Sequence, residues 1–192
     1  RREIPFSRVE WDGHVLEITG WDNAMIQVYT GNGKGKTTAA FGLALRASGH
    51  GHRVFIGQFL KGQRYGEVLA LEGHSLIDVE QFGTEVCITR ENVSQEDYNR
   101  AKAGLDRCSA AMDGGRYRLV VFDEVCVAIA FGLLNESDVM AVLDRVPDGV
   151  ELVLTGRYAS ERLMERADLV TEMREVKHYY SRGIEIRPGI EN

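Results

Sequence analysis

The chain has 192 residues, of which 44% are hydrophobic and 27% are charged. This length and composition are typical of one globular domain with a core of ordinary size. The formal net charge of −6 argues against nucleic acid as a partner, because such binding depends on many lysine and arginine contacts to phosphate. We find no apolar run of the roughly 18 residues that would span a membrane, and no signal peptide. With three cysteines that match no zinc or disulfide spacing, we expect a cytoplasmic protein with reduced thiols.

The first 23 residues differ in pattern from the rest of the chain. Residues 9–11 and 15–19 flank Asp12-Gly13, a dipeptide typical of hairpin turns. We therefore expect an N-terminal appendage over residues 1–23 that contains a hairpin. A single domain should follow over residues 24–192, since no linker or repeat marks another boundary.

From residue 25 onward, strand-like and helix-like segments alternate. Strands are predicted at residues 25–30, 53–60, 76–82, 119–123, 151–155 and 169–176. Helices are predicted at residues 37–48, 67–72, 94–113, 136–146 and 160–167. Ser94 and Asp97 have the spacing of a capping box at the start of the third helix. Apolar strands that alternate with helices indicate an α/β fold, with a mostly parallel sheet covered by helices on both faces.

The most informative stretch is the glycine-rich segment TGNGKGKTT, which lies between a predicted strand and a predicted helix. Glycines let the backbone curl so that its N–H groups form an anion nest, and the helix N-terminus adds a positive dipole end. Lys36 would place an ammonium among phosphate oxygens, and the Thr37 hydroxyl could reach Mg²⁺. The spacing from Gly31 to Gly35 is one residue shorter than that of the usual phosphate loop.

A second motif is the apolar strand LVVFDE, which ends in two acids. Asp123 at the end of this strand would lie beside the phosphate loop and hold Mg²⁺ directly or through water. Glu124 follows it. Lys61 and Arg157 also follow predicted strands, and in parallel sheets such positions face the ligand crevice. A solvated lysine and a surface arginine are the alternatives for these two residues.

These motifs resemble the P-loop family of ATP:corrinoid (cobalamin) adenosyltransferases. The resemblance rests on GNGKGKTTAAFG at residues 31–42, QFLKG at 58–62, VFDEV at 121–125, TGR at 155–157, VKH at 176–178 and GIE at 189–191. It covers nearly the whole chain from residue 25. Some members of the family carry aromatic residues facing the cobalt after the third strand, whereas the corresponding residues 83–92 here contain none.

The resemblance implies a RecA-like P-loop fold, a homodimer, and ATP and Mg²⁺ as co-substrate and metal. It also implies transfer of the 5′-deoxyadenosyl group to the cobalt(I) of a reduced corrinoid, with release of triphosphate, in adenosylcobalamin biosynthesis or salvage. A reductase or a reduced flavoprotein would supply the electrons.

The residues that carry over from the family fall into three groups. The triphosphate would be held by Gly31, Asn32, Gly33, Lys34, Gly35, Lys36, Thr37 and Thr38, and Lys61 and Glu67 would line the site. Thr37 and Asp123 would bind the metal. Lys36, Arg157 and Glu124 would be the catalytic residues.

Three other functions share parts of this pattern. The main alternative is a RecA-like P-loop ATPase that would use Glu124 as the general base for water. A small-molecule kinase would need an arginine-rich lid, and a GTP-specific switch would need a guanine-reading motif of the N-K-x-D type. We find neither in the sequence.

Overall fold

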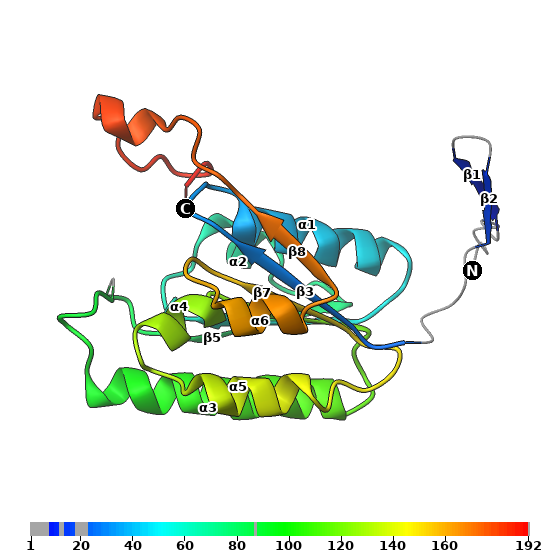
Figure 1. The fold of residues 1–192 in the computed structure, drawn as a ribbon. Coiled ribbons are helices and arrows are strands. Elements are labelled where there is room, and N and C mark those ends of the chain that lie inside the picture. The colour runs from blue at the N-terminus through cyan, green and yellow to red at the C-terminus, as the bar shows by residue number, and fades with distance from the viewer. Residues whose placement is uncertain (1–7, 12–13, 18–22, 87, 192) are drawn as a thin grey trace.

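The central element is a parallel β-sheet (Figure 1). The computed structural model describes residues 8–11, 14–17, 23–86 and 88–191. Six strands of the described chain form the sheet: β3 (Met25–Thr30), β4 (Val54–Phe59), β5 (Ile77–Phe82), β6 (Leu119–Asp123), β7 (Glu151–Thr155) and β8 (Leu169–Glu172). They lie in the order β5-β4-β6-β7-β3-β8, and every neighbouring pair is parallel. The predicted α/β class and parallel sheet are confirmed.

Helices cover both faces of this sheet (Figure 1). The described helices are α1 (Lys36–Gly49), α2 (Gly66–Ala70), α3 (Gln95–Asp113), α4 (Val125–Ala130), α5 (Glu136–Leu143), α6 (Glu161–Arg166) and the 3₁₀ helix η1 (Tyr179–Arg182). Successive strand residues point to opposite faces, so β6 contributes to two cores. Val121 packs in the core that contains residues of α1, and Phe122 packs in the core that contains residues of α3, α4 and α5.

The predicted element boundaries lie within two residues of the observed ones except at the ends of two elements, and the short helices α4 and η1 were not predicted. The capping box at the start of α3 forms, because Asp97 N–H donates to Ser94 Oγ and Ser94 N–H donates to Asp97 Oδ2. The strand predicted at 169–176 ends at Glu172, which pairs with Thr30, the last residue of β3. The helix predicted at 136–146 ends at Leu143. Helix α4 was missed because its sequence, VCVAIA, is apolar throughout and lacks the helical alternation of polar and apolar residues.

Two short strands pair in the described part of the N-terminal segment. Strands β1 (Arg8–Trp11) and β2 (His14–Glu17) are antiparallel, with Trp11 opposite His14. The expected turn at Asp12-Gly13 and the end of the second expected strand at 18–19 lie outside the described residues. The division of the chain into 1–23 and 24–192 stays a prediction. Within the part of the chain that the structure describes, no helix is both long and apolar enough to cross a membrane.

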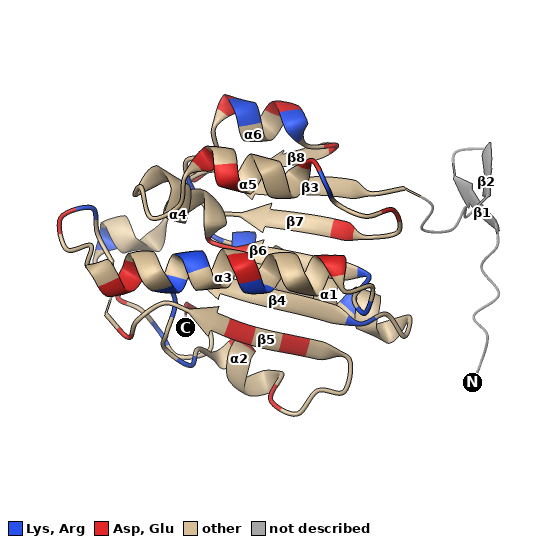
Figure 2. Ribbon diagram, turned by 90° about the horizontal axis from the view of Figure 1, so that it is seen from below, with Lys and Arg blue, Asp and Glu red and all other residues tan. Residues whose placement is uncertain are grey.

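The parallel sheet places the predicted site residues at one edge. Because all six strands run in the same direction, the segments that follow β3, β4, β6 and β7 meet at the carboxyl edge of the sheet. The strands in the middle of the sheet are almost free of charged residues, whereas the outer strand β5 carries two acids (Figure 2). Charge on the inner strands therefore gathers at their ends, where Asp123 is the last residue of β6.

Candidate active site

The glycine-rich loop connects β3 directly to α1. Gly31 and Gly35 have φ angles of 94° and 122°, in the left-handed region that favours glycine, and Gly35 is the N-cap of α1. A Cβ atom at Gly31 or Gly33 would lie 2.4 or 2.7 Å from the carbonyl oxygen of Met173. The Gly33 N–H also donates a hydrogen bond to that oxygen, at 2.6 Å. The loop thus needs glycine because the segment after β8 packs directly against its backbone.

The two lysines of the loop point in different directions. The buried Lys36 Nζ donates to the carbonyl oxygens of Gly31 and Gly33, at 2.7 and 2.8 Å, so its ammonium lies inside the loop. Burial lowers the pKa of Lys36, and the charge of Arg157 acts in the same direction. The exposed Lys34 instead donates to the carbonyl oxygen of Ile190, at 2.7 Å. Lys34 therefore connects the loop to the GIE motif near the C-terminus.

Asp123 is the centre of the site. Its carboxylate is fully buried and accepts four hydrogen bonds, from Thr37 (2.9 Å) and Thr155 (2.7 Å) on Oδ1 and from Gln58 (3.1 Å) and Lys61 (2.8 Å) on Oδ2. Burial by itself raises the pKa of Asp123, but the Lys61 charge and the hydrogen bonds outweigh it, so the pKa is lowered. Asp123 is therefore ionised at neutral pH.

Glu124 has an unusual backbone conformation next to Asp123. Its φ of 66° is left-handed, which costs a non-glycine residue roughly 1–2 kcal/mol. The Glu124 N–H donates to the Thr155 hydroxyl at 2.9 Å, and this bond helps to hold the turn into α4. Burial and the Asp123 charge raise the pKa of Glu124. The two adjacent acids therefore differ in pKa: the surroundings of Asp123 favour its carboxylate form, and those of Glu124 favour its protonated form.

A pocket of about 190 Å³ adjoins this cluster. Its walls are residues 60–63 and 65 from one segment and residues 84–86 and 88 from another, together with Glu124. The side chain of Gln63 joins the two segments, since its amide donates to the Glu85 carbonyl oxygen at 2.6 Å. Tyr65 supplies an aromatic side chain to this pocket, although residues 83–92 contain none.

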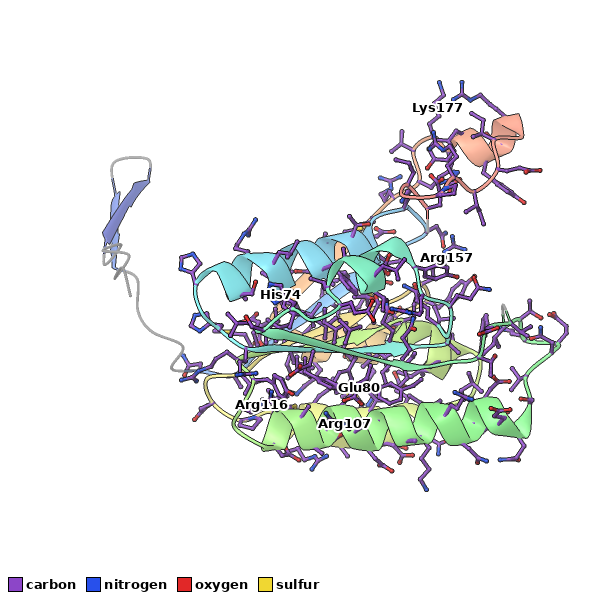
Figure 3. The ribbon with its side chains drawn as sticks, turned by 180° about the vertical axis from the view of Figure 1, so that it is seen from behind. His74, Glu80, Arg107, Arg116, Arg157 and Lys177 are labelled. Carbon is purple, nitrogen blue, oxygen red and sulfur yellow. The ribbon has the colours of Figure 1, made fainter. Side chains whose placement is uncertain are left out.

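The remaining predicted site residues lie outside the group of side chains that hydrogen-bond to Asp123. Arg157, just after β7, is exposed, and its charge acts on Lys36 and Glu124. Figure 3 shows it at the end of the sheet from which the C-terminal segment with Lys177 extends. Glu67 lies in the first turn of α2, and its charge acts on Lys61. The two remaining loop residues, Asn32 and Thr38, are exposed.

Sequence reasoning assigned no role to some residues that build the site. Gln58 and Thr155, both fully buried, fall within the QFLKG and TGR motifs, and each hydrogen-bonds to Asp123. The position of Gln58, a polar residue inside an otherwise apolar strand, could have indicated from the sequence that it has a buried polar partner. His178, in the VKH motif, caps the 3₁₀ helix by accepting from the Tyr180 N–H at 3.1 Å. This contact gives His178 a structural role at the start of η1.

The fold and the site together define a class of protein. A glycine-rich loop between a strand and a helix, a lysine in that loop, and a buried acid hydrogen-bonded to the loop threonine are the features with which P-loop proteins bind nucleotide phosphates.

Comparison with known proteins identifies the family. Residues 22–192 match the family model described as ATP:corrinoid adenosyltransferase BtuR/CobO/CobP. The chain is 36% identical over 178 residues to the corrinoid adenosyltransferase CobA of Salmonella typhimurium, covering 88% of this chain and 86% of that protein. It is 34% identical over 171 residues to the corrinoid adenosyltransferase of Pseudomonas aeruginosa, covering 88% and 84%. The chain therefore belongs to the ATP:corrinoid adenosyltransferase family, and the predicted resemblance is confirmed.

Proposed function

We propose that the chain transfers the 5′-deoxyadenosyl group of ATP to the cobalt(I) of a reduced corrinoid and releases triphosphate, in adenosylcobalamin biosynthesis or salvage. The observation that carries the proposal is the short phosphate loop joined to a buried acid, in a chain that belongs to this family over residues 22–192.

The proposed chemistry needs charge stabilisation rather than acid–base catalysis. Cobalt(I) supplies an electron pair to C5′, the C5′–O bond breaks, and its electrons leave with the triphosphate. The loop N–H groups, Lys36 and Arg157 would stabilise the charge on the leaving group. Holding C5′ opposite the cobalt and keeping water away would be the remaining tasks of the protein.

Thr37 and Asp123 fit the proposed magnesium site. A hydroxyl and an ionised carboxylate are hard oxygen donors of the kind that Mg²⁺ prefers, and their oxygens are 2.9 Å apart. Mg²⁺ usually takes its other ligands from substrate phosphates and water, so one carboxylate beside a phosphate loop is sufficient. When bound, the ion would neutralise charge on the triphosphate. Glu124, at the edge of the pocket, is proposed to face the ribose end of the nucleotide.

The same proposal includes a RecA-like fold, a corrinoid site, a homodimer and an electron donor, as expected from the family. The position of β7 between the loop strand β3 and the acid strand β6 supports a RecA-like arrangement. We propose that an edge of the corrinoid enters the pocket lined by residues 60–63, 65, 84–86 and 88, with Tyr65 as an aromatic wall. A cytoplasmic homodimer that obtains electrons from a reductase or a reduced flavoprotein completes the proposal.

Phosphorus NMR tests this function against the ATPase alternative. With ATP, Mg²⁺ and cobalt(I) corrinoid, triphosphate should accumulate in step with the absorbance of a new cobalt–carbon bond. Omitting the corrinoid should leave ATP intact. If ADP and phosphate form at the same rate with and without corrinoid, the transferase proposal is wrong and the chain is an ATPase.

A further inference from the structure

Lys61 occupies a position that the proposed function assigns to a metal ion. Its ammonium lies 2.9 Å from Thr37 Oγ1 and 2.8 Å from Asp123 Oδ2, the two residues proposed to bind Mg²⁺. The chain reaches this point through Leu60, whose φ of 61° turns the backbone just after β4. A cation supplied by the protein thus bridges the proposed metal ligands.

The surroundings of Asp123 leave no room for a second cation while Lys61 is present. A carboxylate has about four lone-pair sites, and Asp123 accepts four hydrogen bonds, two on each oxygen. A direct bond from Asp123 to a metal therefore requires that one donor leaves. An ammonium and a divalent ion sharing the same carboxylate would also repel each other strongly in this buried site.

Among the three donors other than Thr37, which is itself a proposed metal ligand, Lys61 is the one that can leave. Thr155 and Gln58 are fully buried, and each makes a further hydrogen bond, to the Glu124 N–H and to the Gln81 side chain respectively. The Lys61 side chain is 17% exposed, has a long flexible stem and lines the adjoining pocket. It can withdraw from Asp123 without disturbing the sheet.

We propose that Lys61 and a divalent metal ion are alternative occupants of the Thr37–Asp123 site. Lys61 keeps the buried carboxylate paired and excludes free metal, and it gives up its place when metal and nucleotide arrive together. The displaced ammonium remains beside the phosphate loop, where the triphosphate charge provides a new partner. Lys61 is on this view a positioning residue that couples metal binding to nucleotide binding. The inference rests on the proposed function for the identity of the metal ligands.

The test measures metal binding without nucleotide or corrinoid. Mn²⁺ replaces Mg²⁺ as an EPR probe, and the proteins are the wild type, Lys61→Met and the control Lys102→Met, which removes an exposed lysine on α3. We expect Lys61→Met to bind Mn²⁺ at least about tenfold more tightly than the wild type, because a repelling charge and a competing donor are removed. Lys102→Met should match the wild type. Equal or weaker Mn²⁺ affinity in folded Lys61→Met would overturn the inference.

Two further measurements keep the inference testable if Lys61→Met fails to fold. Lys61→Gln retains a neutral hydrogen-bond donor for Asp123 and should also bind Mn²⁺ more tightly than the wild type. In the wild-type protein, the Lys61 ¹⁵Nζ resonance should stay unchanged with Mg²⁺ alone and shift when Mg²⁺ and ATP are added together. A resonance that shifts equally with Mg²⁺ alone would contradict the inference. Since no corrinoid is present, these results are independent of whether triphosphate is the product of the full reaction.

Discussion

Replacing Asp123 with asparagine should cost folding stability as well as activity. From the sequence, the carboxylate has one evident use, in metal binding, so Asp123→Asn is expected to impair activity far more than stability. The structure changes that expectation, because the same carboxylate accepts hydrogen bonds from Thr37, Gln58, Lys61 and Thr155. The asparagine amide can still hydrogen-bond to the two hydroxyls, but it cannot balance the charge of Lys61.

The size of the effect follows from the burial of this ion pair. Removing one partner of a buried pair typically costs about 3–5 kcal/mol. Asp123 is fully buried but the Lys61 side chain is 17% exposed and can turn towards solvent, so we expect the lower end, about 3 kcal/mol. For a chain of 192 residues this corresponds to a fall in Tm of roughly 6–12 °C.

Urea unfolding followed by circular dichroism, with thermal melts in parallel, measures this loss. The matched control is Asp144→Asn, which breaks an ion pair with Arg166 in which the Asp144 side chain is 67% exposed. It should change the free energy of unfolding by less than about 0.5 kcal/mol. If Asp123→Asn folds normally and loses less than about 1 kcal/mol, the buried pair contributes no more than an exposed one and the reasoning is wrong.

Two more predictions concern the loop lysine and the cysteines. Lys36→Ala should fold but lose ATP binding by isothermal calorimetry, because the described hydrogen bonds of its ammonium go to carbonyl oxygens of the loop. Unchanged ATP affinity would refute the phosphate-loop assignment. In a Cys87→Ala background, Cys108 and Cys126 should resist thiol reagents at pH 8 and react fully in denaturant, because both are buried. Burial, aided by the Glu124 charge, raises the pKa of Cys126 to about 12, so roughly one thiol in ten thousand is ionised at pH 8 and labelling should rise as the pH rises. Rapid labelling of either thiol in the native protein at pH 8 would show that the surroundings of that cysteine are more open than described.

The sequence by itself determined the local elements and the phosphate loop. Strands β3, β6 and β7 have the predicted bounds, because each is a short run of mainly apolar residues bounded by polar or glycine-rich segments. The loop was recognisable because its chemistry depends on adjacent residues, from Gly31 to Thr37. The acid at the end of β6 could be expected beside it, since the carboxyl ends of parallel strands meet at one edge.

Only the tertiary structure decided which side chains form hydrogen bonds to Asp123. Its hydrogen-bond donors lie from 32 to 86 positions away from Asp123 in the sequence; they are Thr37, Gln58, Lys61 and Thr155. Their hydrogen bonds to Asp123 depend on the strand order, in which β6 lies between β4 and β7. Local sequence patterns do not fix that order. The contact of the loop with the carbonyl oxygens of the C-terminal segment was likewise invisible, because backbone acceptors carry no residue signature. A motif fixes which groups are available, whereas long-range packing fixes which of them meet.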